Sequence, residues 1–134
     1  MKKLTDLYWI MNSRGVAEPL SDLLRWAKWM ETHRKEWHLE DKVGSLRIST
    51  IFLGLDHNWG NGDPILWETM IFDEDRPVEL KLGSYSRVVS EDIDQWRHTF
   101  AEEAKAFHEN KVKELQAKLD ACHAPFKFGE KQEE

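Results

Sequence analysis

Two apolar runs separated by a polar loop constrain the fold of this chain more than any other feature. Residues 46–55 (LRISTIFLGL) and 65–72 (ILWETMIF) are rich in β-branched and apolar side chains, and the loop between them reads DHNWGNGDP. Such runs are typical of central strands that are apolar on both faces, and the Gly, Asn and Pro residues of the loop favour a reversal of the chain. We therefore expect an antiparallel hairpin with a long connection.

Strand and helix patterns also precede this hairpin. Residues 7–11 are expected to form a short strand, and residues 12–15 (NSRG) a turn. Apolar residues then recur with helical spacing across residues 23–30, and Ser21 is the predicted N-cap of that helix. The helix is expected to end between residues 33 and 37.

A long helix is expected near the C-terminal end. Thr99 and Glu102 have the spacing of a capping box, and the apolar stripe that follows passes on or close to His108 and continues to about Ala121. The predominantly acidic stretch 73–94 is expected to contain one or two edge strands. These elements predict an α+β fold, in which a small antiparallel sheet with a central hairpin is packed by an N-terminal helix and a long C-terminal helix.

The composition predicts one domain and limits the classes of partner. We expect a single α+β domain over residues 1–124 and a flexible charged tail over residues 125–134. The net charge of −6 makes nucleic acid an unlikely direct partner. A single cysteine, Cys122, excludes an internal disulfide and suits a reducing cytoplasm. Apolar runs stay well short of the ~20 residues of a membrane span, and no signal peptide is recognised, so a cytoplasmic protein is expected.

The polar loop supplies the first candidate binding residues, namely Asp56, His57, Asn58 and Trp59. They follow the end of an apolar strand, where loops commonly carry binding groups. Trp59 is expected to be exposed and to contact a ligand. Asp56 and Asn58 are equally good turn residues, which cap their own backbone, and this structural role is the alternative for both.

Glu68 and His108 complete the set of candidate binding residues. Glu68 interrupts an otherwise apolar strand, and a buried carboxylate is costly unless it is paired. His57 or His108 could pair with it as an acid–base pair, as metal ligands or as a simple ion pair. His108 could equally be a satisfied core residue. No metal or cofactor is identified, because the histidines lack a recognised ligand spacing and no phosphate-binding or nucleophile motif is present.

The central segment resembles a family of small phage and prophage proteins. ISTIFLGLDHNWGNGDPILWETMIF and TFAEEAKAFHE carry this similarity, and the earlier segments YW and DLLRWAKW match it as well. The family pattern has Phe where this chain has Trp67, and its counterpart of residues 73–94 is shorter and less acidic. The resemblance implies a phage or prophage origin and a life in the bacterial cytoplasm. It groups Asp56, His57, Glu68 and His108, but it implies no particular activity.

Three functions are compatible with these patterns, and whether the chain is an enzyme stays open. The first is an accessory protein that binds a host factor, a defence component or a nucleotide-like ligand. The second is a metal-dependent or acid–base hydrolase that uses His57, Glu68 and His108, with Asp56 orienting them. The third is a structural or assembly protein that forms a homodimer through a sheet edge or the C-terminal helix. Expected partners are therefore a host or phage protein or a small ligand, and no membrane.

Overall fold

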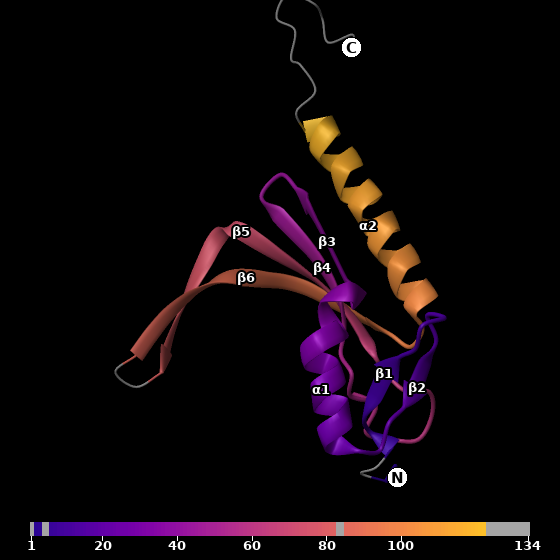
Figure 1. Cartoon of the computed structure of the whole chain (residues 1–134). Coiled ribbons are helices and arrows are strands. Elements are labelled where there is room, and N and C mark those ends of the chain that lie inside the picture. The colour runs from indigo at the N-terminus through magenta and orange to yellow at the C-terminus, as the bar shows by residue number, and fades with distance from the viewer. Residues whose placement is uncertain (1, 4–5, 83–84, 123–134) are drawn as a thin grey trace, which may run out of the picture.

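The structure, a computed structural model, describes residues 2–3, 6–82 and 85–122, and for residues 76–82 and 85–93 it describes the backbone alone. It has the predicted α+β fold, with two antiparallel sheets, an N-terminal helix and a long C-terminal helix (Figure 1). The tail predicted for residues 125–134 lies outside the described residues. In chain order the elements are β1 Trp9–Met11, β2 Ala17–Pro19, α1 Leu23–His33, the 3-10 helix η2 Arg34–Trp37, β3 His38–Val43, β4 Leu46–Phe52, β5 Trp67–Leu82, β6 Tyr85–His98 and α2 Ala101–Cys122.

The larger sheet has the strand order β3-β4-β5-β6, and every neighbouring pair is antiparallel. Its centre is the predicted hairpin, in which β4 and β5 pair from Phe52↔Trp67 to Leu46↔Asp73. The sequence reading did not anticipate β3, which joins β4 through a tight turn at Gly44, where φ is +60°. The reason is composition, because HLEDKV is mostly polar and its side chains are largely exposed.

Helix α2 packs against all four strands of this sheet. Its inward stripe follows helical spacing from Ala104 through His108 to Val112, Leu115 and Leu119. This packing forms two apolar clusters, one at each end of the helix, and His108 lies between them along the stripe. The buried members are Met11, Phe52, Leu66, Trp67 and Ala104 in the first cluster, and Val43, Ile48 and Ile71 in the second.

Helix α1 and the β1–β2 hairpin close the first cluster. Trp29 of α1 is partly buried and meets the Phe52 ring edge-on, with 5.8 Å between the ring centres. The Trp26 indole donates to the carbonyl oxygens of Trp9 and Gly54, which ties α1 to β1 and to the segment that follows β4. Gly54 has φ +74°, and a Cβ there would lie 2.5 Å from the Met30 side chain.

Both helix N-termini differ from the predicted caps by one residue. The N-cap of α1 is Asp22 rather than Ser21, and its carboxylate accepts from the amides of Leu24 and Arg25. At the start of α2, Glu103 rather than Glu102 accepts from the Thr99 and Phe100 amides. At α1 the carboxylate reaches N–H groups that the first helical turn leaves unsatisfied, whereas at α2 the Glu103 carboxylate reaches back to N–H groups just before the helix.

The second half of the β5–β6 hairpin leaves the body of the molecule as a two-stranded ribbon (Figure 1). Pairing of β5 with β4 ends at Asp73, whereas pairing of β5 with β6 continues to Leu82↔Tyr85. Register shifts between residues 71 and 72 and between 73 and 77 accompany this departure. Bulges of this kind bend a strand and increase its twist. The predicted edge strands of 73–94 are thus parts of β5 and β6.

Candidate functional site

Asp56 is an organising residue of the polar loop. It is 1% exposed, and its Oδ1 accepts from the amides of Asn58 at 2.8 Å and Ile65 at 3.0 Å, while Oδ2 pairs with the Lys2 ammonium. Burial by itself would raise the pKa of Asp56, but the hydrogen bonds from Lys2 and from the two amides outweigh it and hold that pKa below its ordinary value. These contacts give Asp56 the structural role, capping of its own loop, that was the alternative to binding a ligand.

The other loop candidates have separate environments. The Asn58 side chain accepts from the Gly60 amide and donates to the Asp63 carbonyl, so it stabilises the loop from within. The backbone amide of His57 donates to the Ile65 carbonyl. Trp59 is 71% exposed, as expected. Of the loop candidates, Trp59 is therefore the one whose side chain is most available to a partner.

Glu68 lies on the opposite face of the sheet from His108. It pairs with Arg97 on the neighbouring strand β6, with 3.1 Å between Arg97 Nε and Glu68 Oε2. The next residue, Thr69, belongs to the α2 face, and successive residues of a strand alternate between faces. The convergence of His57, Glu68 and His108 that a hydrolase would need is therefore not formed. Among the described residues, no group of three or more His, Cys, Asp or Glu side chains is arranged to hold a metal ion.

His108 is the centre of a hydrogen-bonded chain that runs beneath α2. Its Nε2 lies 2.7 Å from Asp41 Oδ2, and its Nδ1 lies 2.7 Å from Thr50 Oγ1. Thr50 Oγ1 is in turn 2.7 Å from Thr69 Oγ1, and Thr69 Oγ1 is 3.1 Å from His98 Nε2. Each of the four strands β3 to β6 thus contributes one side chain. We call these five residues the polar chain.

The partners fix a direction for the hydrogen bonds of the polar chain. A carboxylate can only accept, so His108 Nε2 carries a hydrogen and donates to Asp41. In the neutral imidazole, Nδ1 then accepts from the Thr50 hydroxyl. Thr50 accepts from Thr69, and Thr69 accepts from His98 Nε2. Every hydroxyl donates once and accepts once, so the network has no unmatched group.

The two ends of the polar chain differ in their exposure to solvent. Asp41 is 55% exposed, whereas His108 is 2% exposed and both threonines are fully buried. At the other end, burial lowers the pKa of His98, and the charge of Glu103 opposes this shift. Hydrogen bonds from the Phe100 and Thr99 amides lower the pKa of Glu103. The lowered pKa of His98 favours its neutral form, and in that form Nε2 carries the hydrogen that it donates to Thr69.

The polar chain has the groups of a nucleophilic triad without the access that catalysis needs. Asp41, His108 and Thr50 follow the carboxylate–imidazole–hydroxyl order. The Thr50 hydroxyl, however, is fully buried between β5 and α2, where a substrate carbonyl could not approach it. The arrangement instead gives both ring nitrogens of a buried histidine a hydrogen-bond partner. His108 is therefore a satisfied core residue, which was the alternative to a role in binding.

The sequence reading missed the residues that pair with His108. Asp41, Thr50, Thr69 and His98 come from four different strands, and no motif links them. One signal was available, because Thr50 and Thr69 are hydroxyl residues inside the two apolar runs. In the antiparallel register they are direct cross-strand partners.

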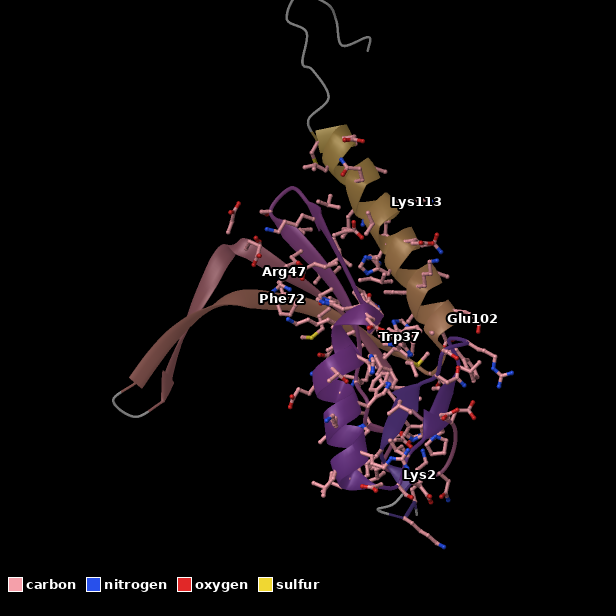
Figure 2. The ribbon with its side chains drawn as sticks, in the orientation of Figure 1. Lys2, Trp37, Arg47, Phe72, Glu102 and Lys113 are labelled. Atoms are coloured by element: carbon pink, nitrogen blue, oxygen red, sulfur yellow. The ribbon has the colours of Figure 1, made fainter. Side chains whose placement is uncertain are left out.

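The face opposite α2 carries charged and aromatic groups in a second arrangement. The Arg47 guanidinium lies 4.2 Å from the centre of the Phe72 ring, and Figure 2 shows the two side chains together. Arg47 also pairs with both Glu40 and Glu74. Glu68 and Arg97 lie on the same face. Because each of these cations is paired, the face presents mixed charges rather than a field of one sign.

Comparison of the chain with protein-family models, with curated proteins and with solved structures found no match. The described helices include none that is both long enough and apolar enough to cross a membrane.

Proposed function

We propose that this chain is a phage- or prophage-encoded accessory protein that acts in the bacterial cytoplasm by binding a host protein through the β5–β6 ribbon. The observation that carries the proposal is the ribbon itself, which extends beyond the sheet and away from α1 and α2 (Figure 1). The phage or prophage origin rests on the resemblance of the central motif. The ribbon supplies the reason to expect a protein partner.

A two-stranded ribbon that stands alone in water is only marginally stable, and it gains stability when a partner covers it. Beyond Asp73 the described part of β5 has β6 as its one neighbouring strand. The register places Val78 opposite Val89, Leu80 opposite Arg87 and Leu82 opposite Tyr85, and strand alternation puts these three pairs on one face of the ribbon. That face has mostly apolar positions, which favours a partner that buries them.

The two edges of the ribbon are not equivalent as places for an added strand. Pro77 lies on β5 and has no N–H to donate, so it disfavours pairing along that edge. Strand β6 contains no proline, and it is one of the two outer strands of the larger sheet. A partner strand would therefore add to β6, as in other cases of β-strand addition. The net charge of −6 suits a basic host protein, for example one that itself binds nucleic acid.

The test is to shorten the ribbon without disturbing the sheet. Residues 78–89 are replaced by Asn-Gly, which can join Pro77 to its cross-strand partner Ser90 through a two-residue turn. The tagged full chain, the shortened chain and Trp59→Ala are each used to capture proteins from a bacterial lysate, with quantification by mass spectrometry. We expect a host protein to be retained by the full chain and by Trp59→Ala and to be lost with the shortened ribbon. Circular dichroism and thermal melting check that all three are folded.

Two other results would contradict this assignment of the surface. Loss of the captured protein with Trp59→Ala alone would move the binding surface to the polar loop. Sedimentation of the same variants examines the homodimer alternative, in which the added strand comes from a second copy. If the full chain sediments as a dimer and the shortened chain as a monomer, the partner of the ribbon is a second copy of the chain and not a host protein.

A further inference from the structure

A pocket of about 160 Å³ lies where three segments that are far apart in the sequence meet. Its lining comes from residues 15–17 around the start of β2, from residues 63, 64 and 66 at the end of the polar loop, and from residues 99–102 where β6 leads into α2. Figure 2 shows Glu102 at the lower end of α2, whereas the β5–β6 ribbon leaves the molecule on the other side of the view (Figure 1). We call this the α2 pocket, and it is separate from the ribbon.

The lining of the α2 pocket is mostly apolar, and part of it faces solvent. Val16 and Phe100 are 57% and 59% exposed, although both are large apolar residues. Exposed apolar side chains that gather at a hollow mark places where a partner binds. An apolar cavity of about 150 Å³ is large enough for a benzene ring. The α2 pocket therefore has room for one large side chain, such as that of phenylalanine.

The charged residues that line the pocket are all acidic. Asp63 and Glu102 are exposed, and neither carboxylate forms a hydrogen bond or an ion pair with the described residues. The neighbouring Glu103 is instead engaged by the Thr99 and Phe100 amides. Within the described part of the chain, no lysine, arginine or histidine belongs to the lining. Two free carboxylates thus accompany the apolar hollow, and their charge is complementary to a cation.

We propose that the α2 pocket binds a segment of another protein in which an aromatic or large aliphatic side chain stands next to a lysine or arginine. The apolar side chain fills the pocket as an anchor and covers Val16 and Phe100, which removes apolar surface from water. The cation pairs with Asp63 or Glu102, and this charge complementarity selects a basic segment over an acidic one. The pocket is a second binding surface, and it does not depend on the ribbon.

The probe is the peptide acetyl-Lys-Phe-Lys-amide, titrated at low salt into the ¹⁵N-labelled full chain. Acetyl-Gln-Phe-Gln-amide keeps the ring without the charge, and acetyl-Lys-Ser-Lys-amide keeps the charge without the ring. The backbone amide resonances of Gly15, Ala17 and Ala101 report on the lining of the pocket. We expect these resonances to shift in a saturable way with the probe, and each control peptide to bind roughly fivefold more weakly or less tightly still.

Two pairs of variants locate the site on the surface. Glu102→Gln removes a carboxylate of the pocket, and Glu109→Gln removes the same charge from an exposed position about two turns further along α2. Phe100→Ser removes the exposed ring and leaves a residue that suits a helix N-terminus, whereas Leu24→Ser removes a side chain of α1 that is 81% exposed. Circular dichroism and thermal melting check that all four variants are folded.

Glu102→Gln should weaken binding of the probe roughly two- to fivefold, the range of one exposed ion pair, and Phe100→Ser roughly tenfold. Glu109→Gln and Leu24→Ser should leave it unchanged. Unmoved lining resonances at about 10 mM probe would overturn the site, and equal binding of all three peptides would overturn its chemistry. An equal loss with Glu109→Gln and Glu102→Gln would show attraction by net charge alone. A full chain that sediments as a dimer and is dissociated by the probe would show that a second copy, and not another protein, occupies the pocket.

Discussion

Thr50→Val gives the sharpest test of the polar chain, because valine has nearly the shape of threonine but cannot hydrogen-bond. The Thr50 hydroxyl bridges His108 Nδ1 and Thr69 Oγ1, with 2.7 Å to each. Its removal leaves the imidazole nitrogen without a donor and the Thr69 hydroxyl without an acceptor. Both groups are buried, so water cannot replace the lost partner.

The expected loss of stability follows from these two orphaned groups. Each buried polar group that loses its partner costs roughly 1–3 kcal/mol, and the added methyl group recovers up to about 0.8 kcal/mol. Thr50→Val should therefore lower the free energy of unfolding by about 2–4 kcal/mol, a large part of the 5–15 kcal/mol that is usual for a domain. With a urea m-value of about 2 kcal/mol/M, the midpoint of unfolding should fall by roughly 1–2 M.

Urea unfolding followed by tryptophan fluorescence and by circular dichroism measures this change. Thr50→Ser is the matched control, since it keeps the hydroxyl and loses one buried methyl group, worth about 1 kcal/mol. The network argument requires Thr50→Val to be the more destabilised of the two. If Thr50→Val is as stable as the native chain while Thr50→Ser is weakened, packing rather than hydrogen bonding determines the stability of this layer.

Three further predictions concern other parts of the fold. Gly54→Ala should cost about 1–3 kcal/mol and lower the melting temperature more than Gly15→Ala, because both have positive φ but only at Gly54 must the end of the Met30 side chain move aside for the new Cβ. Asp56→Asn should cost about 1–2 kcal/mol at pH 7 through loss of the Lys2 pair. Because the pKa of Asp56 is lowered in the folded state, its charge stabilises above pH 3.8, and in urea unfolding the difference from the native chain should shrink as the pH falls below that value. The pKa of His98 is also lowered in the folded state, so the stability that neutral His98 contributes is complete above pH 6.5 and is lost as the pH falls toward the folded-state pKa. His98→Gln should therefore flatten the change in unfolding free energy between pH 7.5 and 5.5.

Local patterns predicted those parts of the fold whose signal lies within one element. The runs 46–55 and 65–72 became β4 and the start of β5, and the helical spacing after residue 100 became α2. Strand β3 could not be predicted in this way, because its polar residues satisfy no period-two pattern and its place is set by pairing with β4. The long register of β5 with β6 is also a property of the pair rather than of either strand.

The candidate site residues show the same difference between signals within one segment and signals that depend on strand pairing. Asp56 and Asn58 bond to their own loop, so the turn chemistry visible in the sequence was sufficient to suggest their structural role. Glu68 was recognised as needing a partner, but its partner is Arg97, which lies opposite it only once β5 and β6 are in register. A single carboxylate in an apolar strand predicts that the carboxylate is paired, but the register of the sheet determines which residue is its partner.

The position of the polar chain explains why two threonines lie at the centre of the sheet. His108 occupies the inward stripe of α2 between apolar residues, where an unpaired imidazole would be costly. Thr50 and Thr69 meet beneath it as cross-strand partners, and a shift of one residue in that register would place their hydroxyls on opposite faces of the sheet. The chain of hydrogen bonds is therefore formed in one alignment of β4 with β5 and lost in its neighbours. An all-apolar layer would tolerate slippage more readily, so the buried histidine and its threonines select the native register of β4 with β5.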